Sequence, residues 1–294
     1  MEPISMEYWL ALLYSMLAVI ALPGNVWVIV VVMDQICSRR HYHYSTFRLK
    51  GRGQKRSQKA AVQSSATVYL LILSVVDLIS ILPVPFLVVD IFRNRWPFGL
   101  VLCKLMFFCE GANKSLSPLL LTALSLDRYM AVCLPMLVWM RQAKFACFIL
   151  LLCFIYSLFF IVPVIWHSEV NGMLDAKHKL HPKCVVGMSR LFDLLQLVFC
   201  YAAPLLIICS VYLAILSRLY RHTRKNFASA GISAIPNSSR RRRPRTRISL
   251  TRVVKSSVLV VAFYFVCWTP YWVVRFLAML QGLYPFLSFP HSSA

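Results

Sequence analysis

The sequence predicts an all-α fold, a polytopic bundle of transmembrane helices that forms one domain over residues 1–294. Two observations lead to this prediction. First, 59% of the residues are apolar and only 14% are charged, with a mean hydropathy of +0.67, whereas soluble domains are roughly half apolar and a quarter charged. Second, the apolar residues gather in long runs, and about 20 such residues can cross a bilayer as a helix.

Six runs are long enough to span the bilayer. They cover about 8–33, 66–92, 102–134, 145–166, 191–217 and 253–280. The first run does not fit a signal peptide, because Glu2 and Glu7 stand beside it in place of basic residues, its apolar stretch is too long, and no small-residue cleavage site follows. We therefore expect it to be the first of six spans.

The formal net charge of +22 follows the connections between the spans. Residues 34–65 hold eight Lys or Arg and residues 217–256 hold twelve, including the run RRRRPRTR at 240–247. Excess Lys and Arg mark the cytoplasmic side, so we expect a multi-pass protein of the plasma membrane with its N-terminus outside. Such a run can also be a nuclear signal or bind RNA, but beside a membrane span we expect the lipid bilayer as partner and no nucleic acid.

The connections between the spans contain few residues that suggest a catalytic or metal-binding site. Residues 34–65 and 222–247 are polar, basic and interrupted by glycine or proline, and are predicted to be disordered cytoplasmic loops. The external segment 167–190 is expected to be a loop, and its three histidines fit solvated side chains better than zinc ligands. We find no glycine-rich phosphate loop, metal-spaced Cys/His cluster or nucleophile–base pair, so we expect no enzyme and no cofactor.

Two of the ten cysteines differ from the rest. Most lie within spans, where cysteine behaves as a small apolar residue. Cys103 opens the third span on the outside, and Cys184 lies in the external loop before the fifth span. Because both face an oxidising compartment in this topology, we expect a disulfide between them. It would tie the external loop over the mouth of the bundle.

Polar residues inside the spans are functional candidates. Asp77 lies in the middle of the second span, where an ionisable group is costly. The third span carries a polar stripe at the spacing i, i+3, i+4 and i+7: Glu110, Asn113, Lys114 and Ser117. On an otherwise apolar helix such a stripe must face the interior of the bundle. It is either a functional site or polar packing between helices.

The third span ends in SLDRYMAVCLP, where Asp127, Arg128 and Tyr129 stand side by side. An arginine at the membrane edge can extend toward water while its stem stays apolar, and a neighbouring carboxylate can hold it in an ion pair. Taken alone, Arg128 and Tyr129 would be read as an interfacial anchor.

The sixth span carries a second face at the same helical spacing: Trp268, Tyr271, Trp272 and Arg275. Pro270 interrupts the helical hydrogen bonds beside this face and allows a bend. An aromatic stripe is more often plain packing. Beside a proline, and ending in a charged residue, this one fits a hinge that senses a ligand.

These motifs resemble those of the rhodopsin-like (class A) G-protein-coupled receptors. The matching stretches, in chain order, are PGNV with Asn25, LSVVDL with Asp77, WPFGLVLCKL with Cys103, SLDRYMAVCLP with Pro135, the fifth span with Pro204 and Tyr212, and FVCWTPYW. Each motif is weak alone, but six in order form a strong signal. WPFG, SLDRYMAV and VCWTPYW are most similar to the somatostatin, opioid and invertebrate allatostatin-C receptors, which bind peptides.

The resemblance implies a receptor for an extracellular peptide, specifically a neuropeptide, that signals through a heterotrimeric G protein, with arrestin as a further candidate partner. It implies ligand contacts at Glu110, Lys114, Tyr271, Trp272 and Arg275. It implies an activation switch at Trp268, Pro270 and Tyr212, and G-protein coupling at Asp127, Arg128 and Tyr129.

Two groups of these residues each have two interpretations. Asp77, Asn113 and Ser117 match the family's sodium pocket, where a carboxylate and neutral oxygens hold a hard cation, but they can also be polar packing. Glu110 matches the acidic position that pairs with cationic ligands, although the family usually has Asp there. Lys114 could instead neutralise Glu110 as an i,i+4 pair.

The resemblance fails in places. Leu151 stands where the family usually has tryptophan, and Tyr264 where it has phenylalanine. The first cytoplasmic loop is long, and the chain holds six of seven expected spans, without the Asn-Pro-x-x-Tyr motif. The alternatives are therefore a truncated, non-signalling receptor isoform or fragment and, less favoured, a six-span channel or transporter. The latter would need a pore helix or helices broken in matching halves, and neither is evident.

Overall fold

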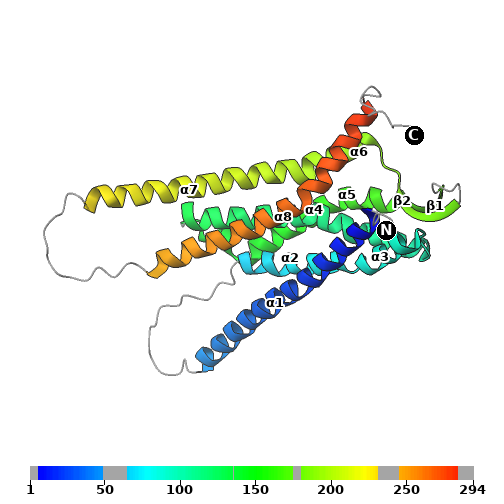
Figure 1. The fold of residues 1–294 in the computed structure, drawn as a ribbon. Helices are drawn as coiled ribbons and strands as arrows, with labels where there is room; N and C mark the ends of the chain where they lie inside the picture. The colour runs from blue at the N-terminus through cyan, green and yellow to red at the C-terminus, as the bar shows by residue number, and fades with distance from the viewer. Residues whose placement is uncertain (1–5, 49–64, 135, 175–179, 231–244, 284–294) are drawn as a thin grey trace. The chain divides into compact units, whose positions relative to one another are not determined.

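The computed structural model describes residues 6–48, 65–134, 136–174, 180–230 and 245–283 (Figure 1). These residues form two compact units, and each is described by itself. The first unit comprises the described parts of 1–123 and 138–188, and the second those of 124–137 and 189–294. The single receptor domain expected over residues 1–294 stays a prediction.

The first unit is built from helices and one hairpin. Its elements are α1 (Met6–Arg48), α2 (Ser65–Ile81), α3 (Val84–Arg93), the first part of α4 (Gly99–Cys133), the short 3₁₀ helix η1 (Val138–Arg141), α5 (Ala143–Trp166), β1 (Ser168–Leu174) and β2 (Leu180–Val186). Helix α1 packs against α2 and α3, and α2 packs against α5.

The second unit contains the end of α4 from Leu124 on and two long helical segments. The first segment consists of α6 (Arg190–Leu197), the π-helical turn η2 (Val198–Ala202) and α7 (Ala203–Ala230), which follow one another without a break. The second segment is α8 (Arg245–Leu283), which contacts α6.

The six predicted spans are confirmed in number and order within the described residues. The helices long and apolar enough to cross a membrane cover Ala11–Ser38, Ser65–Arg93, Gly99–Cys133, Ala143–Trp166, Arg190–Arg221 and Val258–Leu277. Long apolar runs favour helices in a bilayer because a helix satisfies all of its backbone hydrogen bonds internally.

The second span is interrupted by proline. Helix α2 ends at Ile81, and Pro83 is the N-cap of α3, which also carries Pro85 in its first turn. Proline has no backbone N–H to donate to the preceding turn. The one continuous span expected over 66–92 is therefore two helices, α2 and α3.

The helices continue into connections that were predicted to be disordered, 34–65 and 222–247. This prediction is wrong for the described parts, because α1 and α7 extend past the apolar runs and α8 begins before its run. The remaining residues of both stretches lie outside the described part of the chain. Helix propensity explains the extension: no glycine or proline follows the first and fifth apolar runs until Gly51 and Gly231.

The external segment was expected to be a loop, and it is a β-hairpin. Strands β1 and β2 pair antiparallel, with Val170 opposite Cys184 and Gly172 opposite Pro182. The prediction missed it because each strand lacks a strict alternation of polar and apolar residues. Within the described residues no three His, Cys, Asp or Glu side chains are grouped to hold a metal. One of the three histidines, His178, lies outside those residues.

Candidate functional site

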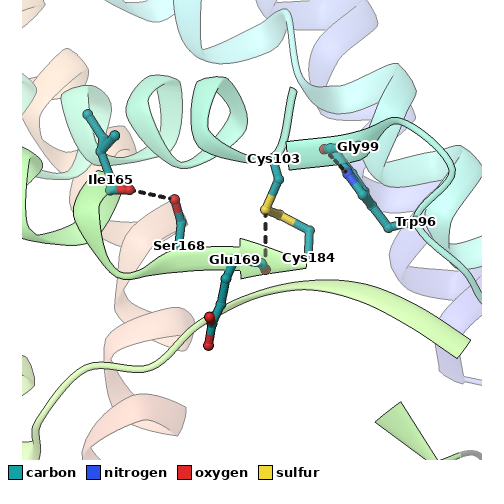
Figure 2. Close-up of a disulfide and its surroundings, with 7 residues drawn as sticks. All are labelled: Trp96, Gly99, Cys103, Ile165, Ser168, Glu169 and Cys184. Carbon is teal, nitrogen blue, oxygen red and sulfur yellow. Dashed lines mark hydrogen bonds between the residues drawn. A yellow bond between two sulfur atoms is a disulfide. The ribbon is translucent and has the colours of Figure 1, made fainter. Parts of the chain in front are cut away.

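The hairpin of the first unit is bonded covalently to α4. Cys103 at the start of α4 and Cys184 in β2 form a disulfide with their Cα atoms 5.6 Å apart, which confirms the predicted pairing (Figure 2). The Sγ atom of Cys103 also lies 3.6 Å from the carbonyl oxygen of Glu169 in β1. A disulfide sulfur carries no proton, so this is a packing contact and not a hydrogen bond.

Trp96 organises the chain between α3 and α4. Its ring is buried. Its Nε1–H donates to the carbonyl of Gly99, the contact drawn as a dashed line in Figure 2, and the two atoms lie 2.9 Å apart. Its backbone N–H donates to the carbonyl of Pro182 in β2 at 2.7 Å. The ring of Phe98 meets it edge to face at 5.1 Å. Trp96, Cys103 and the buried Met106 thus form a small apolar core beneath the hairpin.

An ion pair makes a third link between the hairpin and the helices. Nζ of Lys183 in β2 lies 3.2 Å from a carboxylate oxygen of Asp90 in α3, and both side chains are largely buried. Pro182, Lys183 and Cys184 are consecutive, so three neighbouring residues of β2 carry a backbone hydrogen bond, an ion pair and a disulfide. The pairing with Asp90 was not predicted, because no local pattern links two residues so far apart in the sequence.

The polar stripe of α4 is paired internally. Lys114 and Glu110 form an i,i+4 ion pair, in which the Lys114 side chain is 10% exposed and the Glu110 side chain 36% exposed. Of the two roles considered for Glu110, ligand contact and pairing with Lys114, the structure shows the pairing. A role of either residue in binding a ligand stays a prediction.

Asp77 of α2 and Ser117 of α4 are brought together in the first unit. The Ser117 side chain lies beside the Asp77 carboxyl group. The Ser117 hydroxyl is fully buried and has no hydrogen bond of good geometry to any described residue. Asn113, one turn earlier on α4, is half-buried. A carboxylate, an amide oxygen and a hydroxyl are ligands that suit a hard cation, so the chemistry of these three side chains is compatible with sodium, and the sodium site itself stays a prediction.

Two of the three predicted switch residues, Trp268 and Pro270, lie on α8 of the second unit, and the third, Tyr212, lies on α7. The helix continues through Pro270. The ring of Tyr271 meets Trp268 edge to face at 5.6 Å and Trp272 at 5.2 Å. Trp272 is buried, whereas Trp268 and Tyr271 are half-buried. The expected aromatic face is therefore a contiguous row of rings on both sides of the proline.

Arg275, the charged end of this face, is bonded to a residue that sequence reasoning missed. Its Nη2 donates to the Oδ1 of Asp193 at 2.6 Å, linking α8 to α6. Asp193 lies in the first turn of α6, whose N-cap Ser189 accepts from the Phe192 backbone N–H. An acidic side chain is favoured there by the helix dipole. This local preference could have identified Asp193 as a helix-start residue but not as the partner of Arg275.

A second link between the two helical segments also escaped prediction. The hydroxyl of Tyr201, in the π-turn η2, lies 2.6 Å from the Oγ1 of Thr269 in α8. Thr269 directly precedes Pro270. The sequence signal was a polar residue beside Pro270, and this did not indicate a partner.

The motif of Asp127, Arg128 and Tyr129 lies near the end of α4 in the second unit. Asp127 is fully buried, and Arg128 and Tyr129 are half-buried. Nearby in the same unit, the hydroxyl of Ser125 donates to the hydroxyl oxygen of Tyr212 at 3.5 Å, and both residues are buried. Complete burial of a carboxylate is costly unless it is hydrogen-bonded or paired. The role of Asp127, Arg128 and Tyr129 in G-protein coupling stays a prediction.

The fold and these contacts define a multi-span helical membrane protein with a disulfide-bonded hairpin and a proline-containing helix flanked by aromatic rings. Residues 56–292 match the family model described as 7 transmembrane receptor (rhodopsin family). The chain therefore belongs to the rhodopsin-like (class A) family of G-protein-coupled receptors.

Individual relatives give the same picture. The chain is 33% identical to Probable G-protein coupled receptor C06G4.5 of Caenorhabditis elegans, over 76% of this chain and 50% of that protein. It is 28% identical to Neuropeptide receptor 18 of Caenorhabditis elegans, over 74% of this chain and 48% of the relative. It is 30% identical to Somatostatin receptor type 3 of Rattus norvegicus, over 90% of this chain and 56% of the relative. The chain thus spans about half the length of these curated relatives.

Proposed function

We propose that the chain acts as a receptor that binds an extracellular neuropeptide and relays this binding to a heterotrimeric G protein. The observation that supports it most directly is membership of the rhodopsin family together with similarity to proteins named as neuropeptide and somatostatin receptors. The disulfide-bonded hairpin adds support, because a fixed external element offers main-chain groups and side chains to a peptide. An enzymatic activity is not part of this proposal.

The ligand is proposed to contact two charged positions and the aromatic rings near one of them. Glu110 and Lys114 neutralise each other in the first unit, and Arg275 is neutralised by Asp193 in the second. A ligand amine would compete with Lys114 for Glu110, and a ligand carboxylate would compete with Asp193 for Arg275. Tyr271 and Trp272 would contribute flat apolar surfaces, which favour peptide side chains at low entropic cost. A peptide with both charges suits this set.

The response is proposed to pass along α8. Rearrangement of Trp268 beside Pro270 would change the bend of the helix, because the proline leaves one backbone carbonyl without its helical partner. The cytoplasmic part of α8 would then move away from the end of α4. This movement would free Arg128, flanked by Asp127 and Tyr129, for a G-protein helix, with Tyr212 stabilising the open state. Arrestin is proposed as a second partner of the same surface.

Three further properties belong to the proposal. Asp77, Asn113 and Ser117 would hold a sodium ion, whose positive charge would stabilise the half-buried Asp77 carboxylate. The excess of Lys and Arg in the basic connections supports an orientation with the N-terminus outside. A disulfide at the hairpin supports exposure of that side to an oxidising compartment, consistent with delivery to the plasma membrane.

Nucleotide exchange on G proteins tests the proposal. Membranes from cells expressing the chain would be incubated with a slowly hydrolysed GTP analogue and a panel of neuropeptides that includes somatostatin. We expect at least one peptide to raise nucleotide uptake, and Arg128→Ala to abolish the response while retaining peptide binding. Arg95→Ala is the matched control, because Arg95 is an exposed arginine outside the proposed machinery. If no peptide changes uptake while rat somatostatin receptor type 3 responds in parallel, the proposal is wrong.

A further inference from the structure

Tyr201 occupies an unusual place in the helical segment of the second unit. It lies in η2, where the Ala203 backbone N–H donates to the carbonyl of Val198, five residues earlier. Such a π-turn accommodates one residue more than an α-helical turn and changes the direction in which its side chains point. Its aromatic ring contacts the Phe265 ring at 5.5 Å and the Trp272 ring at 5.7 Å. One side chain therefore touches α8 both before and after Pro270.

The hydroxyl of Tyr201 acts as a donor. Thr269 Oγ1 donates to the backbone carbonyl of Phe265 at 2.6 Å. Threonine has one hydroxyl proton, so in the contact between Tyr201 and Thr269 the proton must come from Tyr201. The result is a directed chain of two hydrogen bonds, from Tyr201 to Thr269 and from Thr269 to the α8 backbone.

This chain ends inside the hinge. Pro270 has no N–H, so the carbonyl of Val266, four residues earlier, receives no helical hydrogen bond from it. The neighbouring carbonyl of Phe265 is the one that accepts the Thr269 hydroxyl. A threonine that bonds back to the carbonyl four residues earlier tends to bend its helix. Thr269 thus acts on the same turn that the proline weakens, and Tyr201 acts on Thr269.

The surroundings make the contact hard to replace. Thr269 lies within a candidate membrane span and is exposed on the surface of the chain, and Tyr201 is half-buried in another span. Hydrocarbon offers no hydrogen-bond partner, so a hydroxyl there must find one within the protein. Water cannot substitute for Tyr201 as it would on the surface of a soluble protein.

We propose that Tyr201 is a positioning residue for the Pro270 bend, acting through its hydrogen bond to Thr269. Its hydroxyl orients the Thr269 hydroxyl. Its ring packs against Phe265 before the proline and Trp272 after it. The effect on signalling rests on the proposed function, but the effect on the bend does not.

Spin labels test the bend without any G protein. Labels at Leu216→Cys in α7 and Leu259→Cys in α8, both exposed positions of the second unit, would report the distance between the two helices. Exposed free cysteines would first be replaced by serine: Cys37, Cys147, Cys209 and Cys267. The distance distribution would be measured in nanodiscs for Tyr201→Phe, Thr269→Val and Thr269→Ser. Tyr220→Phe is the matched control, because Tyr220 is 70% exposed on α7.

We expect Tyr201→Phe to keep the ring and to broaden the distance distribution. The population of the less populated separation should rise roughly threefold, because that is the effect expected from the loss of one interhelical hydrogen bond in a membrane. Thr269→Val should do the same, the double variant should add little, and Thr269→Ser and Tyr220→Phe should resemble the parent. Unchanged distributions in Tyr201→Phe and Thr269→Val would overturn the inference. A change in distance without a change in nucleotide exchange would support the positioning role and contradict the signalling part of the proposed function.

Discussion

Different kinds of bond hold two regions of the molecule: the hairpin of the first unit, and the helices α6–α7 and α8 of the second unit. The hairpin has a disulfide, a backbone hydrogen bond and a largely buried ion pair on three consecutive residues of β2. In the second unit, α6–α7 and α8 are joined through a partly exposed ion pair, the hydroxyl contact of Tyr201 with Thr269, and aromatic rings. Among its described residues these contacts are all noncovalent.

The difference separates a fixed element from an adjustable one. A disulfide cannot exchange partners during a conformational change, whereas an ion pair or a hydroxyl contact can form with a ligand or another side chain at small net cost. Elements that move in proteins are drawn from the regions of low local stability. We therefore expect the hairpin to hold its shape during the proposed movement of α8.

The largest effect is expected for the disulfide. Cys103→Ser or Cys184→Ser should lower the free energy of unfolding by about 2–4 kcal/mol, because the bond closes a long loop, and should reduce surface delivery. Thermal unfolding in detergent and cell-surface staining would measure both. Cys147→Ser is the control, since Cys147 is a free, exposed cysteine. Equal losses in all three variants would show that the hairpin is not specially fixed.

The next effect concerns the buried carboxylate at the end of α4. Asp127→Asn should raise basal nucleotide exchange if Asp127 restrains Arg128, since a charge-assisted hydrogen bond is worth about 1.5–3 kcal/mol, and about 1.4 kcal/mol changes a two-state population tenfold. Basal uptake of the GTP analogue would be compared with Asp34→Asn, which changes an exposed aspartate of α1. Unchanged basal exchange in Asp127→Asn would identify the motif as an interfacial anchor.

A smaller effect is expected for the ion pair of the hairpin. Lys183→Met and Asp90→Asn should each destabilise the first unit, and their double-mutant cycle should give a coupling of about 1 kcal/mol, the upper end for ion pairs reached by solvent. Thermal unfolding of the four proteins would supply the cycle. Additive effects would mean that the disulfide and the Trp96 hydrogen bond hold the hairpin by themselves.

The smallest effect is expected for Asp193 and Arg275. Because the Arg275 side chain is 35% exposed, solvent screening should limit the loss in Asp193→Asn to about 0.5 kcal/mol. A shift in unfolding temperature that disappears in high salt would fit this pair. A loss as large as that of Cys103→Ser would erase the contrast between the two regions.

The sequence was sufficient for features that depend on local composition. The six spans and their order follow from apolar runs. The disulfide follows from two cysteines expected on the same side of the membrane, Cys103 at the start of the third run and Cys184 in the connection before the fifth. The same reasoning failed for the basic connections, where α1 and α7 continue because their sequences lack helix breakers until Gly51 and Gly231. A polar, charged composition suggested disorder, but an existing helix is extended at lower cost than a new one is nucleated.

Fewer contacts of the candidate site could be predicted from the sequence. Spacing along one helix identified the pair Glu110 and Lys114, because both members lie on α4. Tyr201 and Thr269, like Asp193 and Arg275, lie on different helices, and their pairing depends on how those helices pack. The π-turn that orients Tyr201 has no sequence signature in the patterns used for helices and strands.

The two hydrogen bonds from Tyr201 to Thr269 and on to the Phe265 carbonyl have a consequence for cooperativity. Hydrogen bonds in series polarise one another, and each strengthens its neighbour by roughly 10–30% in condensed-phase estimates. A phenol proton on one helix thereby alters the electron density of a peptide carbonyl on another. Vibrational spectroscopy of a ¹³C-labelled Phe265 carbonyl would register this polarisation as an amide frequency that depends on the Tyr201 hydroxyl, even though the two groups are not bonded directly to each other.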